Sequence, residues 1–95
     1  MYTTIRSYGG GDAFTNALVE NEDAIRGIIS PINGFQGYYV VRGNDGPTTI
    51  SVFDDQSGAD ESVQAAASWI RDNLADASPG APAITTGEVV ISFQP

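Results

Sequence analysis

The sequence predicts an α+β domain with the element order β-α-β-β-α-β, in which a four-stranded antiparallel sheet carries two helices on one face. Two runs rich in aromatic and β-branched residues, 35–42 and 48–54, flank a turn-forming cluster at 43–47 and indicate one β-hairpin. A segment with helical apolar spacing lies on each side of this hairpin, and a strand-like run lies near each end of the chain. We expect one domain over residues 1–95.

The first strand is expected over residues 2–8, where alternation places Tyr2, Thr4, Arg6 and Tyr8 on one face. After three glycines, Asp12 is expected to cap the first helix. The apolar residues of this helix recur at three-, four- and seven-residue spacing and should face the sheet: Phe14, Leu18, Ile25, Ile28 or Ile29, and Ile32.

The hairpin strands carry apolar side chains on both faces. In the first strand, alternation groups Phe35, Tyr39 and Val41 on one face and Tyr38 and Val40 on the other; in the second, Ile50 and Val52 oppose Phe53. Two helices cover only one face of the sheet. The other face is therefore expected to meet the sheet of an identical subunit, which predicts a homodimer.

The second helix is expected to begin at a capping box formed by Ser57 and Asp60. Its apolar stripe contains small residues that allow close packing on the sheet: Ala59, Val63, Ala66, Ala67, Ile70 and Leu74. A loop over 75–83 follows, and the last strand is expected over 83–93.

Composition excludes several classes of function. The chain has no Cys and no His, which removes thiolate chemistry and the commonest general base, haem ligand and zinc ligand. Its net charge is −8, and its four basic residues are scattered, so nucleic acids and anionic membranes are improbable partners. We expect a soluble cytoplasmic protein without a metal ion, and no run of apolar residues approaches a membrane span.

Trp69 is the most informative candidate for a binding site, because it flanks the apolar stripe of the second helix instead of lying at its centre. Something should cover so large a ring. The cover is either the partner subunit or the 75–83 loop, or else Trp69 forms a pocket wall against a planar ligand.

Tyr38, Tyr39, Arg6 and Arg42 are the other candidates for ligand binding. A phenol packs and still forms hydrogen bonds within a cleft, although tyrosines in strands are more often structural. The two arginines either anchor a carboxylate or phenolate or form ion pairs with Asp54, Asp55 or Glu88. The pair Asp54 and Asp55 is better suited to a turn and a helix entry than to a proton-sharing dyad, because adjacent strand residues point to opposite faces.

The chain resembles the dimeric α/β-barrel superfamily with its ferredoxin-like fold, and within it the antibiotic biosynthesis monooxygenase (ABM) type domains. The resemblance rests on the element order, the Pro-x-x-Gly-Phe-x-Gly-Tyr run over 31–38, the strand end at 51–55 and the Ala-Ser-Trp at 67–69. It implies a homodimer whose two sheets pack into a barrel, with a pocket between sheet and helices in each subunit.

Members of the ABM group include cofactor-free oxygenases of polycyclic quinols, in which hydrogen bonds hold the deprotonated substrate in a dry cavity, and haem-degrading enzymes. Trp69 matches the helix Trp of the oxygenases, whereas Ala65 stands where they typically have Asn. The haem-degrading branch relies on a proximal His that this chain lacks. Three functions stay open: a cofactor-independent oxygenase of an aromatic or quinol-type metabolite, a non-catalytic binder of a small apolar ligand, and an accessory or scaffold dimer.

Overall fold

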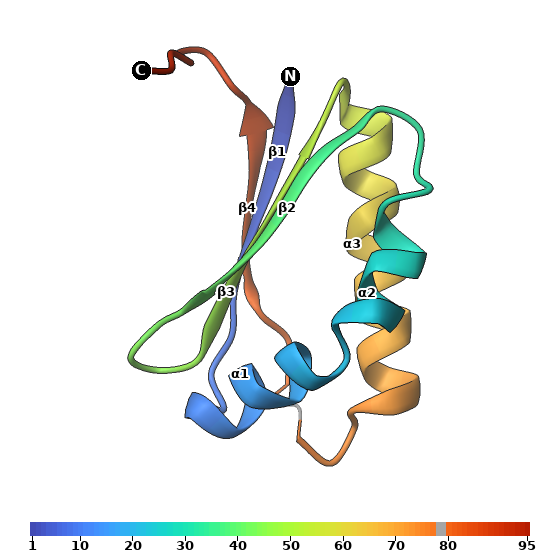
Figure 1. Cartoon of the computed structure of the whole chain (residues 1–95), viewed down its shortest axis with the longest axis vertical. Coiled ribbons are helices and arrows are strands. Elements are labelled where there is room, and N and C mark those ends of the chain that lie inside the picture. Colours follow the sequence, from blue (N-terminus) through green and yellow to red (C-terminus); the bar gives the residue numbers. More distant parts are fainter. Residues whose placement is uncertain (78–79) are drawn as a thin grey trace.

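The computed structural model describes residues 1–77 and 80–95. Its strands are β1 (Tyr2–Ser7), β2 (Phe35–Arg42), β3 (Pro47–Phe53) and β4 (Ala83–Glu88), and its helices are α1 (Gly11–Glu20), α2 (Glu22–Ile29) and α3 (Gln56–Asn73). The strands form one antiparallel sheet in the order β2-β3-β1-β4, and the helices lie on one side of it (Figure 1). The predicted α+β class, the four-stranded antiparallel sheet and the side of the helices are confirmed.

The core lies between the sheet and the helices. The register pairs Tyr2 with Phe53 and Arg6 with Thr49, so alternate residues of β1 and β3 point together toward the helices. Phe14 of α1 and Phe53 of β3 are completely buried there, and the ring of Tyr8 packs edge-on against Phe14 at a centroid distance of 5.3 Å. The alternation read from residues 2–8 therefore identifies the face that builds the core.

The first helix is divided in two, so the expectation of two helices is corrected to three. Asn21 leaves the helical conformation (φ −110°, ψ 24°), and its side-chain amide donates to the carbonyl of Ala17 at 2.7 Å. Asn competes with the helix by bonding to nearby backbone, which explains the interruption at this residue. The break does not disturb the predicted apolar stripe, since Leu18, Ile25 and Ile29 are all buried.

The helix N-termini also differ from expectation. The N-cap of α1 is Gly10, in the left-handed region at φ 86°, and not Asp12. The N-cap of α3 is Asp55, whose carboxylate accepts hydrogen bonds from the Gly58 backbone at 3.2 Å and the Ser57 hydroxyl at 2.8 Å, so the predicted capping box is wrong. Within the described ranges, no helix is both long and apolar enough to cross a membrane.

A β-bulge changes the faces of the first hairpin strand. Phe35 pairs with Phe53 and Gly37 pairs with Val52, so a step of two residues along β2 corresponds to a step of one residue along β3. This shift moves Phe35 to the helix-facing side, where its ring packs edge-on against Phe53 at 5.8 Å. Phe35 therefore shares a face with Tyr38 and Val40, and the expected grouping with Tyr39 and Val41 is wrong.

The last strand is shorter than the predicted 83–93. β4 pairs only with β1. The amide of Val89 donates to the carbonyl of Met1 at 2.9 Å, and Met1 is the residue before β1 begins. Without a further strand opposite it, the backbone beyond Val89 cannot continue the ladder. Residues 89–95 therefore leave the sheet as an extended C-terminal arm beside the N-terminus (Figure 1).

Candidate ligand-binding site

A cleft of about 630 Å³ opens between the edge strand β2 and the helices α1 and α2. We call it the outer cleft. Its helix wall is aliphatic with a polar outer end, and its strand wall is mostly aromatic; it is lined by Leu18, Val19, Glu22, Ile25, Arg26, Ile29, Ser30, Phe35, Tyr38, Tyr39 and Val40. β2 is an edge strand with a neighbouring strand on one side only, and side chains of α1 and α2 border the space beside its free edge.

A second, much smaller space of about 10 Å³ lies deeper, between the sheet and α3. We call it the inner cavity. It is lined by Tyr8, Leu18, Ile25, Ile28, Ile29, Tyr38, Thr49, Ala66, Trp69 and Ile70. Leu18, Ile25, Ile29 and Tyr38 line both spaces, so the outer cleft and the inner cavity adjoin at these side chains.

Arg6 of β1 lies beneath this region with only 2% of its surface exposed. Its Nε donates to the Thr49 hydroxyl at 3.0 Å, and its two terminal nitrogens donate at 3.3 Å to the Ser51 hydroxyl and the Ser62 carbonyl. All three partners are neutral. The neighbouring Thr4 hydroxyl, on the same face of β1, is buried and has no hydrogen-bond partner within the described residues. This part of the core is therefore polar, and no carboxylate among residues 1–77 and 80–95 forms an ion pair with its positive charge.

Two tyrosines adjoin this guanidinium. Burial raises the pKa of Tyr38 above its ordinary value, while the charge of Arg6 and hydrogen bonds with Thr49 and Arg6 lower it in part. Burial likewise raises the pKa of Tyr8, with the Arg6 charge opposing and the nearby Tyr38 adding to the shift. Both phenols are therefore neutral donors at neutral pH, and Arg6 is close enough to both to influence their ionisation.

The structure brings some of the predicted site residues together and separates others. Tyr38 and Trp69 line the inner cavity, and Trp69 is half-buried against the core. Arg6 lines neither space but lies near enough to Tyr38 to affect its ionisation. Tyr39 lies at the rim of the outer cleft with 58% of its surface exposed. Trp69 is covered to this extent by residues of its own chain.

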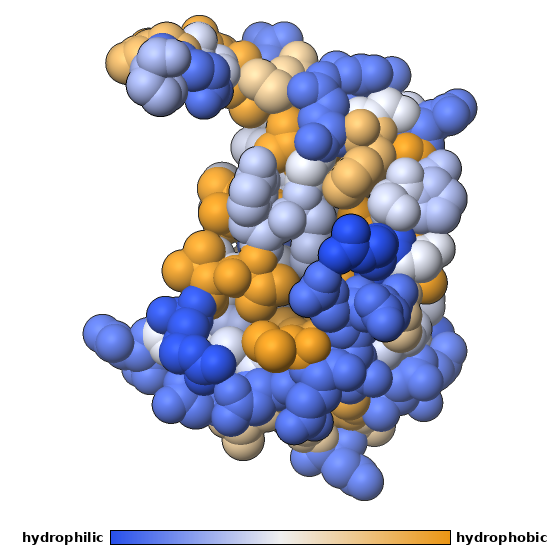
Figure 2. Space-filling view, viewed as in Figure 1, coloured by the Kyte–Doolittle hydropathy of each residue, from blue (hydrophilic) through white to orange (hydrophobic). Residues whose placement is uncertain are grey.

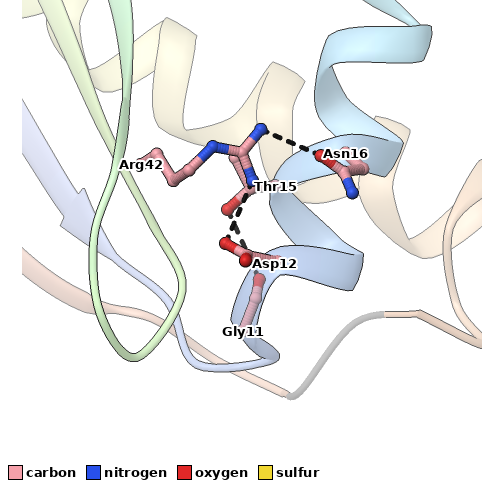
Figure 3. A network of polar contacts seen from close by, with 5 residues as sticks. All are labelled: Gly11, Asp12, Thr15, Asn16 and Arg42. Carbon is pink, nitrogen blue, oxygen red and sulfur yellow. Dashed lines mark hydrogen bonds and ion pairs between the residues drawn. The ribbon is translucent and has the colours of Figure 1, made fainter.

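Arg42 lies outside both spaces, at the far end of β2. Its guanidinium forms an ion pair with Asp12 at 3.0 Å and donates to the amide oxygen of Asn16 at 2.9 Å (Figure 3). These contacts tie the hairpin to the first turns of α1, where Thr15 also donates to the carbonyl of Gly11. Arg42 therefore joins β2 to α1 and does not face the cleft.

The expected ion pairs of Arg6 and Arg42 with Asp54, Asp55 or Glu88 do not form. Asp55 instead caps α3, and Asp54 accepts a hydrogen bond from the side chain of Gln36. Asp54 and Asp55 follow the end of β3, and Glu88 ends β4 opposite Tyr2, whereas Arg6 pairs with Thr49 and Ile84 farther along the sheet. The predicted turn and helix-entry role of the two aspartates is thus confirmed for Asp55.

Sequence reasoning missed Thr49, Glu22 and Arg26 as residues of the site. Glu22 and Arg26 form an exposed i,i+4 ion pair at the outer end of the cleft, and neither residue carried a sequence signal for a binding site. Thr49 is adjacent to Arg6 through the register of β1 and β3. Alternation in β3 gives the face of Thr49, but only the register gives its neighbour.

No protein-family model matches the chain, and no curated protein matches its sequence. Solved structures do share its fold. A protein of unknown function, NE2512 from Nitrosomonas europaea, is similar with a TM-score of 0.70 and 15% identity over 99% of this chain and 92% of that one. Rv0793 from Mycobacterium tuberculosis is similar with a TM-score of 0.67 and 14% identity over 98% and 97%. These likenesses show the fold alone: a small α+β fold with a four-stranded antiparallel sheet.

Proposed function

We propose that this chain binds a small aromatic molecule in the outer cleft and oxygenates it without a cofactor. The observation that carries the proposal is the outer cleft itself, whose volume of about 630 Å³ is in the range of small-molecule sites. Its walls are aliphatic and aromatic, and Tyr38 supplies a polar group at the deep end. The resemblance to ABM-type domains supports oxygenation as the reaction.

The reaction we propose needs no metal or flavin, because an electron-rich quinol-type substrate can reduce dioxygen itself. The deprotonated substrate transfers an electron to dioxygen, and the two radicals combine to a peroxide anion. This anion takes up the proton that the substrate had lost, and loss of water from the resulting hydroperoxide leaves a new carbonyl group. One dioxygen molecule is consumed for each carbonyl and each water formed. The chain contributes orientation of the ring, exclusion of water by the walls of the cleft, and hydrogen bonds to the substrate oxygen.

Oxygen uptake with anthrone as the substrate tests this proposal. We expect turnover by the wild-type protein, a loss of about tenfold or more in Tyr38→Phe, and a comparable loss in Val40→Trp, which fills the cleft from the edge strand. Arg71→Gln, on the exposed surface of α3, is the matched control and should keep full activity. Turnover that survives in Val40→Trp would show that the reaction does not take place in the outer cleft.

A second candidate function is binding without catalysis. Among the residues that line the outer cleft, Glu22 is the one carboxylate, and it is exposed and paired with Arg26. Such a group is a poor general base for a substrate held at the deep end. This reading predicts saturable quenching of Trp69 fluorescence by anthrone with no oxygen uptake. An accessory or scaffold role would show neither effect.

We also propose that the chain forms a homodimer through the open face of its sheet, which is the face that the helices do not cover. That face carries Ile5, Ile50 and Val52, and Val41 is 48% exposed on the edge strand. Val90 and Phe93 of the C-terminal arm are 81% and 87% exposed. Figure 2 shows apolar surface in the concave middle of this side, between the arm and a hydrophilic lower end. Burial of these side chains by a second copy supports the dimer.

A further inference from the structure

We propose that the inner cavity is a binding site for dioxygen, which it holds beside the ring of an aromatic molecule in the outer cleft. The ligand class is a small apolar gas molecule, whose recognition needs neither a charge nor a hydrogen bond. The role of this dioxygen as the oxidant rests on the proposed function. Its binding rests only on the size and the lining of the inner cavity.

The size of the inner cavity limits its occupant to a very small molecule. A space of about 10 Å³ holds about one water-sized molecule, so a ring does not fit. Water and dissolved gases are the molecules of this size in an aerated solution. Dioxygen is slightly longer than water, and the wall formed by Ile28 and Trp69 can yield to it because both side chains are only partly buried.

The lining of the inner cavity favours dioxygen over water. Apart from Tyr8, Tyr38 and Thr49, it consists of aliphatic side chains and the ring of Trp69. The Thr49 hydroxyl already accepts a hydrogen bond from Arg6, and hydrogen bonds join Tyr38 to Thr49 and Arg6. A buried water needs about two to four polar partners, whereas a dry apolar cavity takes up apolar gases. Among the described residues of the lining, the Tyr8 hydroxyl alone is left to a water molecule.

The position of the inner cavity places dioxygen next to the proposed substrate. The inner cavity adjoins the outer cleft at Leu18, Ile25, Ile29 and Tyr38. The three aliphatic side chains change rotamer without breaking a hydrogen bond, so a diatomic molecule can pass between the two spaces. Dioxygen held there is therefore close to a ring in the outer cleft, which raises the effective concentration of the oxidant at that ring.

Ala66 of α3 limits the size of the inner cavity. It is buried, and it lines the cavity together with Trp69 and Ile70, which follow it at three- and four-residue spacing on the same helix face. A longer side chain at this position would occupy the space of a gas molecule. Ala67 is exposed on the same helix and lines neither space, so it offers a matched control.

Dissolved dioxygen is paramagnetic and increases the relaxation rate of nearby methyl protons, which NMR measures in the whole chain. We expect the increase at Ile70 to exceed that at Ile32 by at least about twofold, because a dry apolar cavity concentrates a gas. The increase at Ala66 should exceed that at Ala59 by a similar factor. Ile32 and Ala59 are matched references, since both are buried in the core and line neither space.

Equal increases at the lining and reference methyl groups would refute the dioxygen site while the outer cleft stands. This comparison uses the wild type, so it does not depend on the folding of a variant. Ala66→Leu should reduce the increase at Ile70 to that at Ile32, and Ala67→Leu should leave it as in the wild type. An undiminished increase at Ile70 in folded Ala66→Leu would also contradict the proposal.

Oxygen uptake with anthrone tests whether this dioxygen reaches the substrate. We expect Ala66→Leu to raise the KM for dioxygen at least about threefold and to leave the KM for anthrone unchanged, because Ala66 does not line the outer cleft. Ala67→Leu should change neither constant. Turnover by folded Ala66→Leu with an unchanged KM for dioxygen would refute the supply of dioxygen from the cavity. No turnover, together with excess relaxation at Ile70, would refute the proposed oxygenation and still support the binding of dioxygen.

Discussion

Tyr8 and Tyr38 are two residues whose ionisation is coupled to the fold. Burial is the largest cause of the raised pKa of each phenol, and the Arg6 charge opposes it. A phenol whose pKa is higher in the folded state binds its proton more tightly there. Its contribution to stability is therefore complete below the unfolded value, about pH 10, and is lost as the pH rises through the folded pKa.

We accordingly expect the free energy of unfolding to decrease above about pH 10 in the wild type, and to decrease less steeply in a Tyr8→Phe, Tyr38→Phe double variant. The double variant has no phenol at these two positions, so neither position can lose a proton at alkaline pH, whatever the stability of the variant at neutral pH. Urea unfolding at a series of alkaline pH values measures the slope. Equal slopes in both proteins would show that these phenols are not the coupled groups.

At the scale of elements, the contact between α3 and β3 depends on the absence of a side chain at Gly58. A Cβ there would meet the carbonyl of Asn33 at 2.8 Å and the ring of Phe53 at 2.9 Å. Both are shorter than real contacts, and Phe53 is completely buried and cannot give way. Gly58 thus lets the first turn of α3 approach the strand and the preceding loop closely.

The two helical glycines should respond oppositely to alanine. Gly58→Ala should lower the free energy of unfolding by roughly 1–3 kcal/mol, because overpacking outweighs the gain in helix propensity. Gly27→Ala in α2, where nothing lies within 4 Å of the added Cβ, should raise it by about 0.5–1 kcal/mol. Chemical denaturation of the two variants beside the wild type measures both. A stabilised Gly58→Ala protein would contradict the close packing of α3 on Phe53.

At the scale of the whole molecule, the helices cover one face of the sheet and leave the other open (Figure 1). Val40 pairs with Thr49, which shares the covered face of the sheet with Phe53, so a charge at Val40 or Phe53 tests the cleft or the core. Ile50 and Val41 are on the open face instead. The proposed dimer is therefore tested at these two positions.

Native mass spectrometry should give twice the chain mass for the wild type, and Ile50→Glu and Val41→Glu should shift it to the monomer. A charge buried in an interface without a partner is strongly unfavourable, whereas the same charge in water costs little. Gln64→Glu on the exposed surface of α3 is the charge-matched control and should stay dimeric. A wild-type monomer, or dimers in both open-face variants, would refute the proposed interface.

The sequence alone determined the α+β class, the hairpin and the faces of β1 and β3, because side chains alternate strictly in an uninterrupted strand. It also determined which apolar residues of the first helical segment are buried, since that stripe continues across the break at Asn21. Arg6 and Trp69 were recognised as candidates from their type and position. The cleft and the neutral surroundings of Arg6 were not foreseen.

Only the tertiary structure decided the features that depend on a partner distant in the chain. One extra residue at Gln36 reversed the face of Phe35, and β4 ended where β1 offered no further backbone to pair with. Arg6 meets hydroxyl groups instead of carboxylates because the register, and not local spacing, brings Thr49 and Ser51 beside it. Alternation is a local property of the backbone, whereas register, strand length and the neighbours of a buried charge are set by segments that meet only on folding.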